Sequence, residues 1–118
     1  MRWWIFVGLA LPIAAQAGEA DVLAVEATRA PDGTYRFDVT VQHADTGWDH
    51  YADAWDVLAP DGTVLGTRTL LHPHVDEQPF TRRLSGVAVP DGITEVTIRA
   101  RDSVDGYGGK ELTVSLPR

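Results

Sequence analysis

The sequence predicts an all-β fold for residues 18–118, and three observations support this. Apolar and polar residues alternate over short runs, as they do in half-buried strands. The tight-turn triplet Pro-Asp-Gly occurs three times, beginning at Pro31, Pro60 and Pro90. After the N-terminal segment, no stretch has the 3.6-residue apolar spacing of an amphipathic helix.

Residues 1–17 have the three-part pattern of a signal peptide. Arg2 supplies the positive charge, residues 3–15 are almost wholly apolar, and Ala15-Gln16-Ala17 has the small-x-small form of a cleavage site. An apolar run of about 13 residues is too short to cross a bilayer, which takes about 20. We therefore expect cleavage after Ala17 and a single exported domain, 18–118, that is periplasmic or secreted. No stable membrane anchor is expected after cleavage, because the chain has no cysteine to carry a lipid.

The first three expected strands are Asp21–Arg29, Tyr35–His43 and His50–Leu58. In the second strand, every other residue from Tyr35 to Val41 is apolar or aromatic, which is the period of a strand with one buried face. Trp55 in the third strand is expected in the core, as a tryptophan at this place commonly is in β-sandwiches.

The remaining expected strands are Val64–Leu70, Pro79–Ser85, Glu95–Asp102 and Lys110–Leu116. Alternation is clearest in the sixth strand, where Val96, Ile98 and Ala100 face inward between polar neighbours. Seven short strands with turn signals between them predict an antiparallel Ig-like or fibronectin-III-like β-sandwich.

The connections divide into two kinds. The Pro-Asp-Gly triplets join strands one to two, three to four, and five to six. In each triplet Pro presets φ, Asp bonds back to the chain and Gly accepts positive φ. Alternate connections of such a sandwich lie at opposite ends. The three tight turns should therefore share one end, and the three longer loops the other.

All four histidines, His43, His50, His72 and His74, lie in or beside the longer loops. In an extended segment, residues two apart project to the same side, so His72 and His74 can face one ion. Imidazole and carboxylate ligands without cysteine or a methionine after residue 17 suit Cu(II) or Zn(II). The sequence thus predicts a copper or zinc site at His50, His72 and His74, with His43 and Glu77 as additional ligands. The alternative is that these histidines are solvated loop residues, with His43 hydrogen-bonded at a strand end.

A second hypothesis uses the aromatic residues of the same loops. Trp48, Asp49, Tyr51 and Tyr107 would form a carbohydrate- or protein-binding surface without a metal. Strand parity also turns Arg82 and Asp102 inward. A buried arginine needs a partner, so the two are expected to form a structural ion pair.

Composition excludes several classes of function. With 10 Lys and Arg against 17 Asp and Glu, the net charge is -7, which argues against binding nucleic acid or anionic membranes. The absence of cysteine excludes thiol catalysis, and no serine lies in a nucleophile-elbow sequence. We therefore expect a non-enzymatic module whose partner is a metal ion, a small ligand or an envelope protein.

Two longer motifs carry a resemblance. They are Gly-Trp-Asp-His-Tyr-Ala-Asp-Ala-Trp at 47–55 and His-Pro-His-Val-Asp-Glu-Gln-Pro-Phe-Thr-Arg at 72–82. With them the chain resembles a group of small exported proteobacterial proteins of uncharacterised function. The resemblance implies an Ig-like sandwich in the cell envelope, and it implies no activity.

Overall fold

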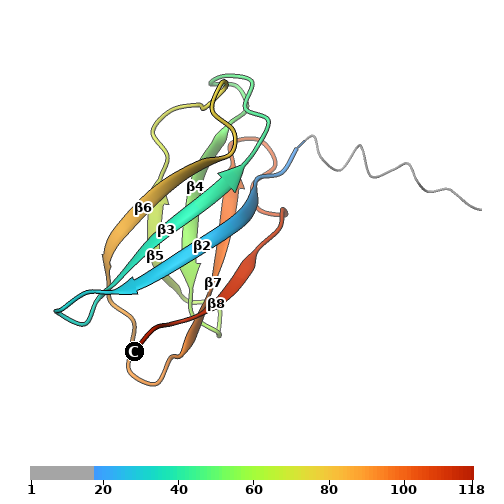
Figure 1. The fold of residues 1–118 in the computed structure, drawn as a ribbon. Coiled ribbons are helices and arrows are strands. Elements are labelled where there is room, and N and C mark those ends of the chain that lie inside the picture. The colour runs from blue at the N-terminus through green and yellow to red at the C-terminus, as the bar shows by residue number, and fades with distance from the viewer. Residues whose placement is uncertain (1–17) are drawn as a thin grey trace, which may run out of the picture.

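The structure, a computed structural model, describes residues 18–118 as seven strands in two antiparallel sheets (Figure 1). The three-stranded sheet has the order β2-β3-β6, and the four-stranded sheet has the order β5-β4-β7-β8. The strands are β2 (Asp21–Arg29), β3 (Tyr35–Gln42), β4 (Ala52–Leu58), β5 (Val64–Thr69), β6 (Phe80–Val87), β7 (Glu95–Asp102) and β8 (Leu112–Ser115). All seven expected strands are present, and the described residues contain no helix. The predicted signal peptide, residues 1–17, and its cleavage motif lie outside the described residues.

The core lies between the two sheets and follows the alternation of the sequence. Phe37, Val39 and Val41 of β3 are fully buried against the second sheet, while their neighbours Asp38 and Thr40 are not. The second sheet contributes further buried residues, namely Trp55, Val57, Val96, Ile98 and Ala100. The expected core position of Trp55 is therefore confirmed.

One end of the molecule, here called the turn end, carries the β2–β3, β4–β5 and β6–β7 connections (Figure 1). Gly33, Gly62 and Gly92 of the three Pro-Asp-Gly triplets have φ values of 90°, 91° and 91°. Asp32 and Asp61 each accept a hydrogen bond from the amide two residues later, which lowers the pKa of both carboxyl groups. The triplets therefore act as self-contained turns, as the sequence predicts.

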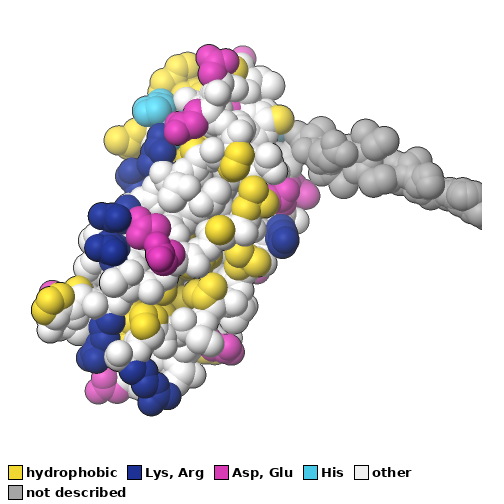
Figure 2. Space-filling view, in the orientation of Figure 1, with side chains coloured by type: hydrophobic (Ala, Val, Ile, Leu, Met, Phe, Trp, Pro, Cys, Tyr) yellow, Lys and Arg dark blue, Asp and Glu magenta, His cyan; other side chains and the backbone are white. Residues whose placement is uncertain are grey.

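The opposite end, here called the loop end, carries the β3–β4, β5–β6 and β7–β8 loops, and β2 begins there (Figure 1). Figure 2 shows acidic side chains and a histidine on the surface of this end. The expected separation of short turns from long loops is thus observed. Among residues 18–118, the structure has no helix long and apolar enough to cross a membrane.

Candidate functional site

Two histidines meet at the loop end. His43 directly follows β3, and His50 closes the β3–β4 loop, where its amide donates to the Gly47 carbonyl. This tight loop turns the His50 ring back toward His43, so that their Nε2 atoms lie 3.3 Å apart. The side chain of His43 is 1% exposed and that of His50 is 22% exposed.

Asp102, the last residue of β7, completes the cluster from the four-stranded sheet. Its side chain is fully buried, and Oδ1 lies 3.1 Å from His50 Nε2. Oδ1 also accepts the amides of Val104 and Asp105, whereas the buried Oδ2 has no hydrogen-bond partner. Oδ2 lies 3.9 Å from His43 Nε2. One ligand atom each from His43, His50 and Asp102 therefore fits within a region 4.8 Å across.

Two more oxygen atoms point to the same place. Asp105 Oδ2 lies 3.2 Å from His50 Nε2. The carbonyl oxygen of Gly18, three residues before β2, lies 2.8 Å from His43 Nε2 and 3.2 Å from His50 Nε2. The centre is thus surrounded by two imidazoles, two carboxylates and a backbone carbonyl.

Asp45 determines how His43 presents its ring. The Asp45 carboxylate lies 2.6 Å from His43 Nδ1, and it also accepts the amides of Ala52 and His74. A carboxylate cannot donate, so Nδ1 must carry the N–H of a neutral His43 ring. The Nε2 lone pair then faces the centre, an arrangement that second-layer carboxylates commonly impose on metal-binding histidines.

The centre has a shortage of positive charge. With His43 held in this tautomer, its Nε2 lone pair faces the Gly18 carbonyl oxygen at 2.8 Å. His50 Nε2 can carry only one proton, and it lies near three oxygen atoms, those of Asp102, Asp105 and Gly18. Among the salt bridges of residues 18–118, no Lys or Arg pairs with Asp45, Asp102 or Asp105. A cation at the centre, whether protons on the rings or a metal ion, would balance these groups.

His72 and His74 lie together but apart from this cluster. Their ring centroids are 4.7 Å apart, in keeping with the expected shared side. His74, however, stacks on Phe80 at 4.0 Å, and its Nε2 accepts from Arg82 Nη2 at 2.9 Å. Burial and the Arg82 charge lower the pKa of His74. Its Nε2 is therefore occupied, and the cluster of potential metal ligands in the described residues contains neither His72 nor His74.

The partners of Arg82 in the structure differ from the expected partner, Asp102. Arg82 bonds His74 and lies 3.3 Å from Glu77, whereas Asp102 lies beside the histidines. The predicted Arg82–Asp102 ion pair is thus not formed, because the β5–β6 loop folds over Arg82 and supplies its partners. Glu77, an expected ligand, is engaged with Arg82 instead.

The loop aromatics are placed differently from one another. Trp48 is 67% exposed and packs edge-on against Tyr51, with ring centroids 5.5 Å apart. Asp49 is exposed beside them. Tyr107 folds onto the outer face of the four-stranded sheet, where its hydroxyl donates to Asp56 and the Arg99 guanidinium covers its ring at 3.8 Å. Trp48 and Tyr51 thus remain together on the surface, and Tyr107 does not join them.

Sequence reasoning missed two members of the cluster and paired a third with a different residue. Asp102 carried an inward-facing signal, but it was assigned to Arg82. Gly18 had no local signal, because His43 lies 25 residues away in the chain and only the packing of β2 beside β3 brings the two together. Asp45 lies two residues after His43, but its spacing alone did not single it out as the partner of that ring.

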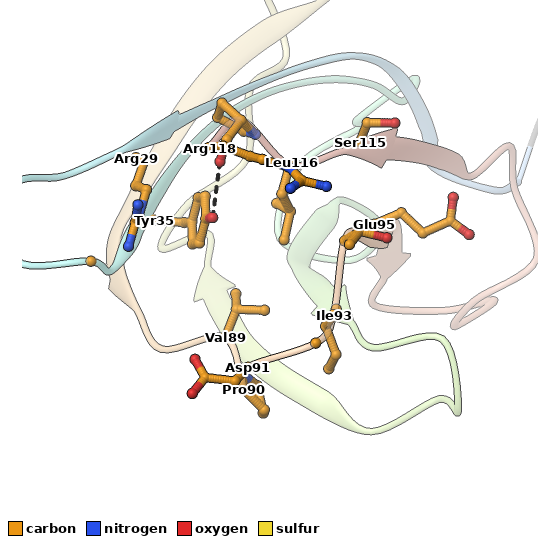
Figure 3. Close-up of a pocket in the computed structure, with 14 residues that line it drawn as sticks. Arg29, Tyr35, Val89, Pro90, Asp91, Ile93, Glu95, Ser115, Leu116 and Arg118 are labelled. Carbon is orange, nitrogen blue, oxygen red and sulfur yellow. Dashed lines mark hydrogen bonds between the residues drawn. The ribbon is translucent and has the colours of Figure 1, made fainter.

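A separate cavity of about 590 Å³ lies at the turn end. Figure 3 shows its lining, where the Tyr35 hydroxyl donates to the Pro117 carbonyl at 2.9 Å. Val89, Ile93 and Leu116 add apolar contact, and charged side chains such as Arg29 and Asp91 also line it. None of the four histidines lines this cavity.

The chain is similar to a protein of Halomicrobium mukohataei named "Putative lipoprotein". The two are 43% identical over 96 residues, which is 81% of this chain and 47% of the archaeal protein. The chain thus spans about half the length of this relative. This relative comes from a halophilic archaeon, so it supports the expected likeness to exported proteins but does not support the proteobacterial group. No protein-family model and no solved structure matches the chain.

Proposed function

We propose that this chain is an exported binding module for a divalent metal ion of the zinc or copper class. The ligands are His43, His50 and Asp102 at the loop end. The observation that carries the proposal is the 3.3 Å separation of the two Nε2 atoms, with the Asp102 carboxylate beside them. Two ligand atoms bound at 2.0–2.1 Å to a tetrahedral ion lie about 3.3 Å apart.

The rest of the ligand set also suits such an ion. Asp105 and the Gly18 carbonyl are near enough to fill further positions. Imidazole and carboxylate oxygen are ligands that zinc and Cu(II) accept, and the described residues contain no sulfur ligand. The buried Asp102 Oδ2 lacks a hydrogen-bond partner, and coordination to a metal ion would satisfy its lone pair instead.

We propose binding rather than catalysis because the cluster is largely enclosed, with the His50 side chain 22% exposed and the other two ligands buried. His43 and Asp102 have side chains that are 1% and 0% exposed. A substrate therefore has little room beside the ion, whereas a bound ion needs none.

Export is part of the proposal. The leader pattern of residues 1–17 and the name of the archaeal relative both support an exported or envelope-associated protein. A periplasmic location would follow in a bacterium with two membranes. The sheet orders β2-β3-β6 and β5-β4-β7-β8 support the Ig-like or fibronectin-III-like sandwich expected from the sequence.

The test is a thermal melt of the protein exported by a bacterial host from the full sequence. The protein is stripped with a chelator and melted alone or with Zn(II) or Cu(II). A metal at a hundredfold excess over its Kd adds about 2.7 kcal/mol, which raises the Tm by on the order of 10 °C for this size. We expect this shift in the natural protein and its loss in His50→Ala.

His72→Ala is the matched control, because it removes an exposed histidine from the same end without touching the cluster. It should keep the full metal-induced shift. The site expected from the sequence, at His50, His72 and His74, instead predicts that both variants lose the shift. A natural protein without a shift, or a His50→Ala protein with an unchanged shift, would overturn the proposal.

A second candidate is a protein- or carbohydrate-binding surface without a metal. The observation in its favour is that the loop end exposes Trp48, Leu71, Val75 and Val104, each more than half accessible. This candidate predicts no metal-induced shift and a loss of ligand binding in Trp48→Ala. The metal site, in contrast, tolerates Trp48→Ala.

A further inference from the structure

We infer that cleavage of the leader after Ala17 supplies a ligand of the metal site, the free α-amino group of Gly18. The inference rests on the proposed metal function and names a ligand that the intact precursor lacks. The inference rests on the position of Gly18 beside His43 and His50 in the structure, since no sequence motif singles out Gly18.

Gly18 already touches the centre through its carbonyl oxygen. That oxygen lies 2.8 Å from His43 Nε2 and 3.2 Å from His50 Nε2. Standard bond lengths place the nitrogen of the same residue about 2.7–3.6 Å from its own carbonyl oxygen, depending on ψ. The nitrogen and oxygen of Gly18 can therefore bind one ion together in a five-membered chelate ring.

A glycine after the cleavage point allows the Asp105 carboxylate to approach closely. A Cβ added to Gly18 would lie 2.5 Å from Asp105 Oδ2. The Asp105 carboxylate, itself 3.2 Å from His50 Nε2, thus packs directly against the Cα of Gly18. The new terminus would sit between a carboxylate and two imidazoles, which favours an amino group there.

The chain just after Gly18 is fixed in place. Ala20 and Val22 are buried in the core. The Lys110 amide donates to Asp21 Oδ1 at 2.7 Å, and the Val22 amide donates to the Lys110 carbonyl at 2.8 Å. The core and the β7–β8 loop therefore hold the first residues of the mature chain beside the site.

Cleavage changes the chemistry of one nitrogen. Hydrolysis adds one water across the Ala17–Gly18 peptide bond, leaving a carboxylate on Ala17 and an α-ammonium on Gly18. On metal binding the ammonium releases one proton to solvent and the amine lone pair binds the ion, as ligand deprotonation generally requires. Before cleavage this nitrogen is a planar amide, whose lone pair is delocalised into the carbonyl. The precursor should therefore bind the ion more weakly than the processed protein, so tight loading follows export.

The test uses the single lysine of the chain, Lys110. In the exported Lys110→Arg protein, the only primary amine is the new α-amino group, so acetylation with an acetyl ester modifies that group alone. Intact mass first shows whether the chain begins at Gly18. Zn(II) and Cu(II) affinities are then measured on the free and acetylated forms, with His50→Ala measured in parallel.

We expect acetylation to weaken binding of the preferred ion at least tenfold and bound metal to slow acetylation of Gly18. Acetylation should leave the metal-free Tm nearly unchanged, since it removes a ligand and not a core contact. If acetylated protein binds as tightly as free protein while His50→Ala binds nothing, the amine is not a ligand and the proposed function stands. A mature chain that begins elsewhere also overturns the inference. If no form binds metal, the proposed function itself fails.

Discussion

The two ends of this molecule are built by opposite means. At the turn end, each Pro-Asp-Gly connection is held by bonds within itself, such as that from the Thr63 amide to Asp61 two residues away. At the loop end, the polar contacts join distant parts of the chain. His50 contacts Asp102 across 52 residues, and Asp45 contacts His74 across 29. Local bonding gives a rigid cap, whereas long-range bonding gathers charged groups at one point.

The largest expected effect comes from removing one aspartate at each end of the molecule and comparing the loss of stability. Asp45→Ala should lower the free energy of unfolding by about 3 kcal/mol, because it leaves buried donors of His43, Ala52 and His74 without an acceptor. Asp61→Ala is the control, since Asp61 is exposed and accepts from one turn residue. Urea unfolding, monitored by tryptophan fluorescence, measures the free energy of unfolding of both variants. If both variants lose the same free energy, burial does not distinguish the two ends.

A second pair of variants separates backbone strain from site chemistry. Gly62→Ala should cost about 1 kcal/mol, because φ is +91° and no atom lies near the added Cβ. Its metal affinity should not change. Gly18→Ala should leave the free energy of unfolding nearly unchanged and weaken metal binding. The new Cβ displaces the Asp105 carboxylate, which can move and which the proposed site would use as a further ligand. Urea unfolding gives the stability of each variant, and metal titration gives the affinity of each. A Gly18→Ala protein with natural affinity would contradict the expected asymmetry.

The smallest expected effect is the pH dependence of stability, which should fall in different windows at the two ends. Burial and Arg82 lower the pKa of His74, so its stabilisation is present above about pH 6.5 and is lost as pH falls below that value. Hydrogen bonds lower the pKa values of Asp32 and Asp61, so their stabilisation persists to about pH 4 and is lost below it.

Urea unfolding of metal-free protein at pH 7 and pH 5 tests the upper window. The natural protein should lose free energy of unfolding between pH 7 and pH 5, and His74→Gln should lose less. The difference should be below about 1.4 kcal/mol per pH unit, which is the limit for one titrating group. His72→Gln, which alters an exposed ring on the same loop, should change that loss less. A larger effect from His72→Gln would show that burial of His74 is not the cause.

The turn end was predictable because its information is local. Pro31, Asp32 and Gly33 specify a turn wherever they occur, and the alternation of Phe37 and Val39 specifies a strand with one buried face. Strand bounds differed from expectation mainly where loops begin, as at His50, which belongs to the loop rather than to β4.

The loop end was predictable only in part. Strand parity placed His43 and Asp102 inward, and both are buried. The His-Pro-His spacing correctly placed His72 beside His74, but it carried no information that Phe80 and Arg82 would occupy the second ring. Which of four histidines converge depends on loop conformations set by contacts between loops. No single segment contains that information.

Asp45 gives the loop end one more property. Its carboxylate binds the His43 ring with one oxygen and the His74 amide with the other, so the β3–β4 and β5–β6 loops share one anchor. Energetic effects of changes in these two loops should therefore be non-additive, as expected for residues joined in one network. Under the proposed function, Asp45 links the exposed Leu71 and Val75 of the β5–β6 loop to the ring that would bind the ion. Any coupling between a ligand on that loop and the ion would be reciprocal.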